Sequence, residues 1–429
     1  MNKVFKVIWN HATQTWTAVS ELGHAKGKTK SKKIVKLTAL AGAMVTALGI
    51  SQAAQAGVDL GNSAVNISPN GTYNGSNSVG QNSIVVGYQN RTDNNWGTTA
   101  LGANNTAIAN SALAVGNNNQ ATKGAATAIG VSSIAGGEAS VAIGNVAQAT
   151  EIRATAVGNR ATATQDSASA YGNRANASAQ FATAIGDNSH ASAAAVAVGT
   201  HANASAQDSV AVGNNSNGSG INSIAIGKDT VASKDHALAM ATEAKASGVQ
   251  SIAIGSYSNA SADSVVSIGQ NSKAGGTVNP ATGKGPGTAA VAVGYLADAS
   301  AANTFAGGKS ATATVDNAVA LGVSSSATSR NAMALGGYAA ASGERAAAVG
   351  AASKASGTAS FAGGTSANAS GLNSVAIGGS MDTAKGAQAS GDYSIAQGTN
   401  STSKQQSDIA RSEERRVGKE CRSRWSPYH

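Results

Sequence analysis

The sequence is poor in the residues that build a conventional protein interior. Aromatic residues account for 4% of the 429 residues and charged residues for 12%, and there are only four prolines and one cysteine. The single cysteine, Cys421, excludes an internal disulfide framework and a thiolate metal site, because both need several cysteines. Gly, Ala, Ser, Asn, Thr, Val and Ile are abundant instead, with 52 glycines. This composition cannot fill a thick core, but it can fill a thin core that is repeated many times.

The formal net charge of +9 belongs to the two ends of the chain. Residues 1–56 contain eight Lys and Arg and one Asp or Glu, while residues 411–429 contain six and three. The ends therefore carry +7 and +3, which leaves −1 for the remaining residues. Nucleic-acid binding needs clustered positive charge, so we expect no nucleic-acid partner.

The N-terminal region has the features of an export signal. Three lysines between positions 32 and 36 precede the mostly apolar run 37–50, which is too short to span a bilayer. Ala54-Gln55-Ala56 then has the small-x-small form that a signal peptidase accepts. We expect cleavage between Ala56 and Gly57, with a retained membrane anchor as the alternative.

The segment before this signal is basic and amphipathic and contains two of the four tryptophans. It resembles the extended signal-peptide region of large Gram-negative autotransporters. The residues that carry the resemblance are Met1-Asn2-Lys3, Phe5-Lys6-Val7-Ile8-Trp9-Asn10, Trp16 and Val19-Ser20-Glu21-Leu22. In that family the extension is thought to slow export, so that the passenger does not misfold in the periplasm.

The body of the chain is one repeat with a period of 14 residues. A glycine closes each unit, mostly 14 residues after the last one. One gap is 13 residues, one is 25 and holds an insertion, and one is 28 and holds a degenerate copy with Ala241 in place of glycine. Such regularity over about 300 residues predicts a stacked repeat architecture. The closing glycines are Gly102, Gly116, Gly130, Gly144, Gly158, Gly172, Gly186, Gly199, Gly213, Gly227, Gly255, Gly269, Gly294, Gly308, Gly322, Gly336, Gly350, Gly364 and Gly378.

Each unit predicts two short strands. The third and first residues before the glycine are mostly Val, Ile, Leu or Ala, and the residue between them is usually Ala. This period-two alternation predicts a β-strand with one apolar face, and the glycine predicts a tight turn. Asn commonly follows and also tolerates left-handed geometry. The apolar pairs that we expect to pack together are Val141 and Ile143, Val210 and Val212, Ile224 and Ile226, and Val375 and Ile377.

The second predicted strand carries only small residues. The third and fifth residues after the glycine are mostly Ala, Ser or Gly, as at Ala161 and Ala163. Fourteen residues cannot fold alone, so the units must stack, pair their strands in parallel and bury one another's apolar stripe. A coil this thin is marginal as a monomer. We therefore expect a homotrimer in which the Val/Ile strands of three chains face a threefold axis.

These units resemble the head of YadA-like trimeric adhesins, which is a left-handed parallel β-roll. The family motif stands here as Asn222-Ser223-Ile224-Ala225-Ile226-Gly227 and Asn373-Ser374-Val375-Ala376-Ile377-Gly378. The resemblance implies an all-β homotrimer displayed on the bacterial cell surface or outer membrane. It also implies adhesion to extracellular-matrix proteins or host-cell receptors and cell-to-cell aggregation. We accordingly assign 57–100 to an N-terminal cap of the head and 101–400 to β-roll repeats.

Two interruptions of the repeat are candidate ligand loops. The first lies between Gly269 and Gly294, where Pro and Gly cannot continue a strand ladder, and includes Lys273 and Lys284. The second lies around Met381 and Asp382. Insertions in solenoids project from one face and often bind. The alternative interpretation is a tolerated surface loop.

The repeat does not continue to the end of the chain. The composition changes abruptly at residues 411–429, so we interpret 401–429 as a spurious or truncated end, with a short basic linker as the alternative. Related adhesins continue into a coiled-coil stalk and a membrane β-barrel, and neither pattern appears. We expect contact with a membrane only through the export signal and a C-terminal anchor that is missing here.

The sequence offers no catalytic, metal or cofactor motif. His190, His201 and His236 are isolated in the repeats and form no recognisable ligand cluster. We expect no enzyme activity and no cofactor. Three rival interpretations stay open: an ice- or mineral-binding solenoid, although the threonines are scattered; a hexapeptide-repeat acyltransferase, although the period is 14; and a structural surface or phage-fibre-like rod.

Overall fold

The computed structural model describes residues 5–10, 15–20, 57–59, 65–68, 80–276, 288–382 and 385–411. The chain divides into two units, residues 1–56 with 69–71, and residues 57–68 with 72–429. In the first unit, β1 (Phe5–Asn10) and β2 (Thr15–Ser20) pair antiparallel. The cleavage position Ala56 lies outside the described residues. Over the described ranges, no helix has the length and apolar character needed to cross a membrane.

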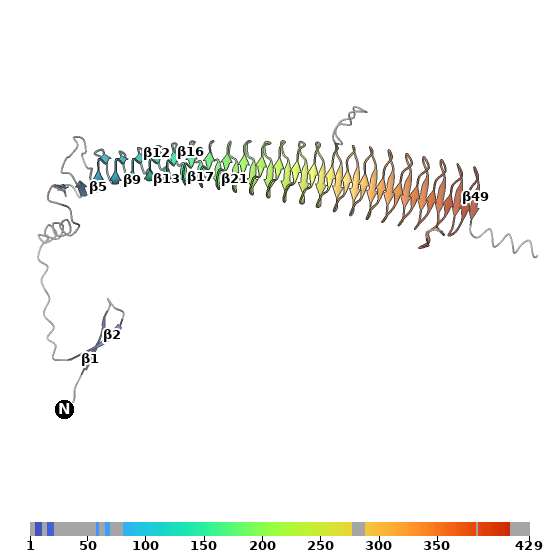
Figure 1. Cartoon of the computed structure of the whole chain (residues 1–429), viewed down its shortest axis with the longest axis horizontal. Coiled ribbons are helices and arrows are strands. Elements are labelled where there is room, and N and C mark those ends of the chain that lie inside the picture. The colour runs from blue at the N-terminus through green and yellow to red at the C-terminus, as the bar shows by residue number, and fades with distance from the viewer. Residues whose placement is uncertain are drawn as a thin grey trace, which may run out of the picture. The chain divides into compact units, whose positions relative to one another are not determined.

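The second unit is a parallel β-solenoid (Figure 1). At its start, β3 (Gly57–Asp59) pairs antiparallel with β4 (Val65–Ser68), which pairs in parallel with the first strand of a long ladder. This first ladder consists of β5 (Ile84–Tyr88), β7 (Thr99–Ala103), β9 (Leu113–Asn117), β11 (Thr127–Val131), β13 (Val141–Asn145), β15 (Thr155–Val157), β17 (Ser169–Tyr171), β19 (Thr183–Ile185), β21 (Val196–Val198), β23 (Val210–Val212), β25 (Ile224–Ile226), β27 (Leu238–Met240), β29 (Ile252–Ile254), β31 (Val266–Ile268), β33 (Val291–Val293), β35 (Phe305–Gly307), β37 (Val319–Leu321), β39 (Met333–Leu335), β41 (Ala347–Val349), β43 (Phe361–Gly363), β45 (Val375–Ile377), β47 (Ile395–Gln397) and β49 (Ile409–Arg411).

A second ladder of two-residue strands runs beside the first. Its members are β6 (Arg91–Thr92), β8 (Thr106–Ala107), β10 (Gln120–Ala121), β12 (Ile134–Ala135), β14 (Gln148–Ala149), β16 (Thr162–Ala163), β18 (Asn176–Ala177), β20 (His190–Ala191), β22 (Asn203–Ala204), β24 (Asn217–Gly218), β26 (Val231–Ala232), β28 (Lys245–Ala246), β30 (Asn259–Ala260), β32 (Lys273–Ala274), β34 (Asp298–Ala299), β36 (Thr312–Ala313), β38 (Ser326–Ala327), β40 (Ala340–Ala341), β42 (Lys354–Ala355), β44 (Asn368–Ala369), β46 (Gln388–Ala389) and β48 (Thr402–Ser403).

The register of both ladders follows the sequence repeat. Ala142 of β13 pairs with Ala128 of β11 and Ala156 of β15, so equivalent residues of successive units stack directly. We call each unit a rung, name it by its closing glycine, and number its residues from that glycine. Described rungs stack 22 deep in the second ladder, which at about 4.8 Å per rung gives a rod on the order of 100 Å long. The predicted all-β solenoid of 14-residue repeats is confirmed.

The interior of the rod is almost entirely alanine and serine. Positions −4, −2, +3 and +5 of each rung point inward, as at Ala154, Ala156, Ala161 and Ala163, all 0% exposed. Of the Val, Ile, Leu, Met and aromatic side chains, only Val85 and Val265 are buried in the described core. The expectation that stacking within one chain buries the Val/Ile stripe is therefore wrong. The −2 alanines occupy the inner face of the first ladder, and because side chains alternate along a strand, their −3 and −1 neighbours point outward.

The turns depend on positive backbone φ angles at three places in a rung. The six glycines expected at the turns, Gly116, Gly130, Gly144, Gly158, Gly213 and Gly227, have φ between 123° and 149°. A second left-handed residue is at +2 rather than at the +1 asparagine, for example Asn118 with φ 56°. The third is at −5, as at Arg153 with φ 57°. In the degenerate rung, Ala241 replaces glycine at φ 95°, where an L-residue is strained.

The first rungs contain a buried asparagine ladder that later rungs lack. Asn105 donates from Nδ2 to Oδ1 of Asn90 at 3.1 Å and to the carbonyl of Gly116 at 2.8 Å. Its own Oδ1 accepts from the backbone N–H and Nδ2 of Asn119 at 3.1 and 2.9 Å. At the next rung Ser133 ends the series, and its backbone N–H donates to Asn119 Oδ1 at 3.0 Å. These bonds satisfy polar groups that burial would otherwise leave unpaired.

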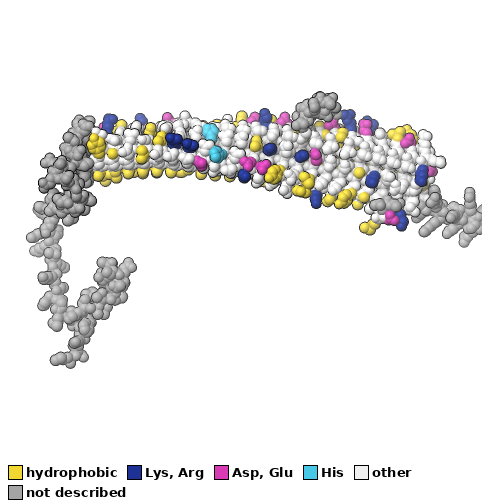
Figure 2. Space-filling view, in the orientation of Figure 1, with side chains coloured by type: hydrophobic (Ala, Val, Ile, Leu, Met, Phe, Trp, Pro, Cys, Tyr) yellow, Lys and Arg dark blue, Asp and Glu magenta, His cyan; other side chains and the backbone are white. Residues whose placement is uncertain are grey.

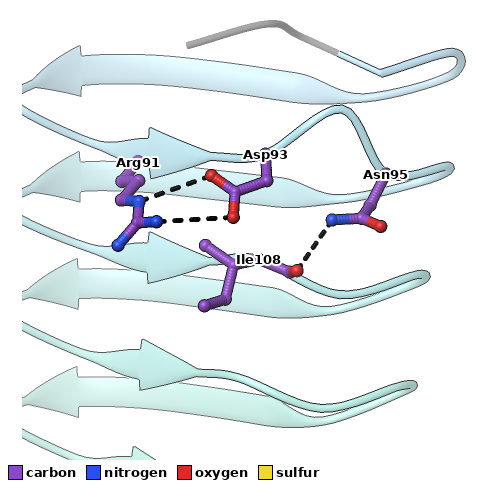
Figure 3. Close-up of polar contacts among 4 residues, drawn as sticks. All are labelled: Arg91, Asp93, Asn95 and Ile108. Atoms are coloured by element: carbon purple, nitrogen blue, oxygen red, sulfur yellow. Dashed lines mark hydrogen bonds and ion pairs between the residues drawn. The ribbon is translucent and has the colours of Figure 1, made fainter. Parts of the chain in front are cut away.

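Polar contacts also hold the first described turn of the rod (Figure 3). Arg91 Nε lies 3.4 Å from Asp93 Oδ1, and Asn95 donates from Nδ2 to the carbonyl of Ile108 in the next rung at 2.7 Å. Regular rungs begin at β5, within the segment that we assigned to a cap, and continue past residue 400 to β49.

The two interruptions leave the ladders in register. Lys273 lies in β32, paired with Asn259 and Asp298, so this residue belongs to a rung and not to the inserted loop. Lys284 lies outside the described residues. In the second insertion Met381 is 98% exposed, and Asp382 forms an ion pair with Lys385 at 3.2 Å.

Candidate adhesive surface

The outer side of the first ladder is an apolar stripe, made by the residues at −3 and −1. Val141, Ile143, Val210, Val212, Ile226 and Val375 are half-buried, and Ile224 and Ile377 are 37% and 45% exposed. Figure 2 shows the hydrophobic side chains as a continuous band along one side of the rod in its N-terminal half. A contiguous apolar surface of this length marks an interaction site, because soluble monomers rarely expose one.

The outer side of the second ladder is mostly polar, with charged residues in a few rungs, among them Lys245, Lys273 and Lys354. Asparagines stack at +4, where Asn203 donates to Asn217 at 3.3 Å and Asn368 donates to Gln388 at 3.0 Å. Two residues further along the chain, at +6, hydroxyl residues align along most of the rod. They are Thr122, Thr150, Thr164, Ser178, Ser192, Ser205, Ser219, Ser233, Ser247, Ser261, Ser300, Thr314, Thr328, Ser342, Ser356, Ser370 and Ser390. We call these two columns the polar face.

The turn before the first-ladder strand is capped from one rung to the next. Asp235 Oδ1 accepts from the backbone N–H of Ile221 at 3.0 Å, and Asp263 accepts in the same way from Val249 at 2.8 Å. Each acceptor lies 14 residues after its donor. These carboxylates satisfy N–H groups that the left-handed turn leaves outside the ladder hydrogen bonds.

The turn after the closing glycine displays side chains in a column at +2. Arg160 and Arg174 occupy this column on adjacent rungs and are exposed, and Asp229 and Glu243 occupy it further along. Asp229 Oδ1 accepts from Asn215 Nδ2 at 2.7 Å. We call this series the turn column.

The histidines do not assemble a site. His190 lies in β20 on the polar face, His201 in the turn column, and His236 in the opposite turn. Among the residues that the structure describes, no group of three or more His, Cys, Asp or Glu side chains could hold a metal ion.

Two families match the chain. Residues 1–50 match the Extended Signal Peptide of Type V secretion system. The YadA head domain repeat matches segments that together cover more than half of the chain: 121–147, 149–175, 177–195, 193–216, 219–240, 246–272, 313–339, 341–367, 364–380 and 386–410. The chain belongs to the YadA-like trimeric autotransporter adhesins. It is also similar to the autotransporter adhesin EhaG of Escherichia coli O157:H7, with 38% identity over 88 residues, which is 20% of this chain and 5% of that protein.

Membership of this adhesin family fixes the export route and the location. The type V signal and the YadA-like head repeats mean that the protein is exported to the bacterial cell surface or outer membrane. The family and the solenoid fold point to a non-enzymatic protein. The chain spans only a small part of the length of EhaG.

Sequence reasoning missed two features of this YadA-like head. The asparagine ladder leaves a signal at +3, where Asn90, Asn105 and Asn119 stand in place of the later Ala or Ser. The turn column leaves a signal at +2. The order of charges in it becomes visible only when the rungs are aligned by their glycines. Both were hidden because the repeat was interpreted mainly through its apolar positions.

Proposed function

We propose that the chain is the adhesive head of a homotrimer, which attaches a bacterium to host cells or extracellular matrix and to other bacteria. The observation that carries the proposal is the opposition of two long outer faces on one rod, an apolar stripe and a polar face. One face suits permanent association of chains and the other suits a ligand. The signal boundary after residue 56 remains part of the proposal, and the head comprises the regular rungs from β5 to β49.

The apolar stripe supports the trimer. Most rungs expose one or two aliphatic side chains about half, and burying a Val or Ile side chain completely stabilises by roughly 1.5–3 kcal/mol. Completing the burial is therefore worth about 1 kcal/mol per side chain, repeated over some twenty rungs. The alanine interior contributes less to stability than this, because each methyl group buries only a small apolar area. Three stripes that face a threefold axis remove the largest apolar surface from water.

The trimer proposal has a matched test on one set of rungs. Aspartate at Val212, Ile226 and Ile254 places charge on the apolar stripe, while aspartate at Asn217, Val231 and Asn259 places equal charge on the polar face. We expect the stripe variant of the exported chain to sediment as monomer or to unfold, and the polar-face variant to stay trimeric. A stripe variant that remains a folded trimer would refute the arrangement.

The polar face supports the adhesive role. It presents Asn, Gln, Ser or Thr groups in most rungs, so a fibrous or crowded ligand meets many similar weak contacts. Three chains and many copies on a cell raise the overall strength of binding without strong single sites. Lys273 of β32 and the insertion residues Lys284, Met381 and Asp382 are additional candidate contacts, and Met381 is 98% exposed.

Binding of the exported chain to immobilised collagen, fibronectin and laminin, and to whole cells, tests adhesion. We expect saturable binding to at least one of these surfaces, weakened by Asn→Asp changes on the polar face. Binding to none of them, together with normal trimer formation, would favour a structural surface rod instead.

A further inference from the structure

We propose that the turn column is a self-complementary surface through which two heads pair side by side in antiparallel orientation. Seven successive rungs take part, and the two heads are related by a twofold axis that passes by His201. The inference rests on the proposed cell-to-cell aggregation. It specifies a second head as the partner and the residues that lie opposite each other. The residues are Arg160, Arg174, Asn188, His201, Asn215, Asp229 and Glu243.

These seven side chains leave the rod in the same way. All of them occupy position +2 of their rungs, and their φ angles lie between 53° and 56°. The first-ladder strands of these rungs stack in register from β15 to β27. At about 4.8 Å per rung, the column spans roughly 29 Å. The column is therefore a straight, evenly spaced row along one edge of the rod.

The order of charge along this row is the central observation. It begins with two cations, Arg160 and Arg174, continues through three side chains without a fixed charge, and ends with two anions, Asp229 and Glu243. A second row that runs in the opposite direction, centred on His201, places Glu243 opposite Arg160 and Asp229 opposite Arg174. Twofold symmetry makes each of these pairs twice. A parallel row in register would oppose like charges.

The neighbouring charges fit the same register. At position +1, Asp187 lies in the basic half and Lys228 in the acidic half, so the halves carry net charges of +1 and −1. Asp187 accepts from Asn173 at 2.6 Å, and Asp229 lies 3.6 Å from Lys228 Nζ, which holds both carboxylates in place. Figure 2 shows basic side chains and an acidic one beside the histidines, and acidic and basic side chains further along the rod.

The single rod leaves the arginines uncompensated. Arg160 and Arg174 are exposed neighbours on adjacent rungs, and within the described ranges neither forms an ion pair. Like charges on adjacent rungs destabilise the fold. The left-handed φ is also unfavourable for arginine. The opposing acidic half of a second head removes this repulsion.

Charge reversal tests the pairing. One variant combines Arg160→Glu with Arg174→Asp, and the other combines Asp229→Lys with Glu243→Lys. Each reversal turns four attractive pairs, each worth roughly 1.4- to 5-fold, into repulsive pairs of similar size. Each variant alone should therefore associate at least about tenfold more weakly than the unchanged chain. A mixture of the two variants should associate again. Sedimentation velocity of the exported chain at low salt measures this, and added salt should weaken the unchanged chain.

Disulfide trapping tests the orientation. With Cys421→Ser as the background, Asn188→Cys combined with Asn215→Cys leaves the charges intact. Antiparallel pairing predicts a bond between positions 188 and 215 of two different heads, whereas parallel pairing gives 188–188 and 215–215. Trimers that never associate, a mixture that does not recover, or same-position bonds would overturn this inference. Loss of the trimer in the unchanged chain would overturn the proposed assembly instead.

Discussion

Replacing Gly213 by alanine should disrupt the rod locally. A Cβ at this glycine would lie 2.6 Å from the carbonyl carbon of Gly227 in the next rung and closer still to its oxygen. These are backbone atoms, so the two rungs would have to move apart. The φ of 133° adds strain of about 1–3 kcal/mol for an L-residue, and forced displacement of packed neighbours costs a similar amount. We expect a loss of roughly 2–6 kcal/mol in the free energy of unfolding.

Two matched changes separate this clash from a general effect of alanine. Gly337→Ala should be neutral or slightly stabilising, because its Cβ would meet nothing closer than the carbonyl oxygen of Val323 at 3.9 Å. Ala241→Gly should stabilise by about 0.5–2 kcal/mol, since the strain at φ 95° exceeds the entropy cost of glycine. Urea unfolding of the exported chain, with hydrogen exchange at the neighbouring rungs, measures all three. Equal stability of the Gly213→Ala and Gly337→Ala variants would refute the reasoning.

Three further substitutions probe the rungs. Asp235→Ala should cost about 0.5–1.5 kcal/mol and speed exchange of the Ile221 amide, because its acceptor is lost, whereas Asp235→Asn should retain most protection. Asn105→Ala should cost about 1–3 kcal/mol, since the backbone N–H of Asn119 loses its acceptor while Asn119 Nδ2 keeps the carbonyls of Val115 and Gly130. Hydrogen exchange at the N-terminal rungs measures this, and an unchanged exchange profile would contradict it. Ala211→Leu should cost about 1–3 kcal/mol or more because the site is 0% exposed and filled, and a normal urea midpoint would count against an alanine core.

The period, the strands and the parallel stacking could be predicted from the sequence because they depend on spacing. Fourteen residues between glycines fix which side chains stack, whatever the inside of the rod contains. The direction of the side chains could not be predicted in the same way. A strand that reads Val-Ala-Ile has two faces, and hydrophobicity alone favours the Val/Ile face as the interior. The structure places the alanine face inside instead, with Ala142 and nearly all its equivalents fully buried, because the thin coil has little room for larger side chains.

The candidate surface was predictable only in part, for the same reason. The sequence predicted the apolar stripe. The proposed trimer requires that the side chains of this stripe point outward from each chain. The turn column and the hydroxyl column depend on comparison between rungs, since each contributes one side chain every 14 residues. Asp235 appears isolated in the sequence, yet its partner Ile221 lies directly beside it in the rod.

An interior limited to alanine and serine has a consequence for how such a head evolves contacts. Nearly every inward position is occupied by the smallest side chains that still fill the space, so the rungs of this chain differ from one another mainly in their outward columns. A change there alters one point on a surface that repeats about every 4.8 Å and leaves the ladder hydrogen bonds intact. The position of a charge along the column, such as Arg174 relative to Asp229, can therefore change independently of stability. This separation makes a solenoid rod suited to specifying both its partner and the register in which they meet.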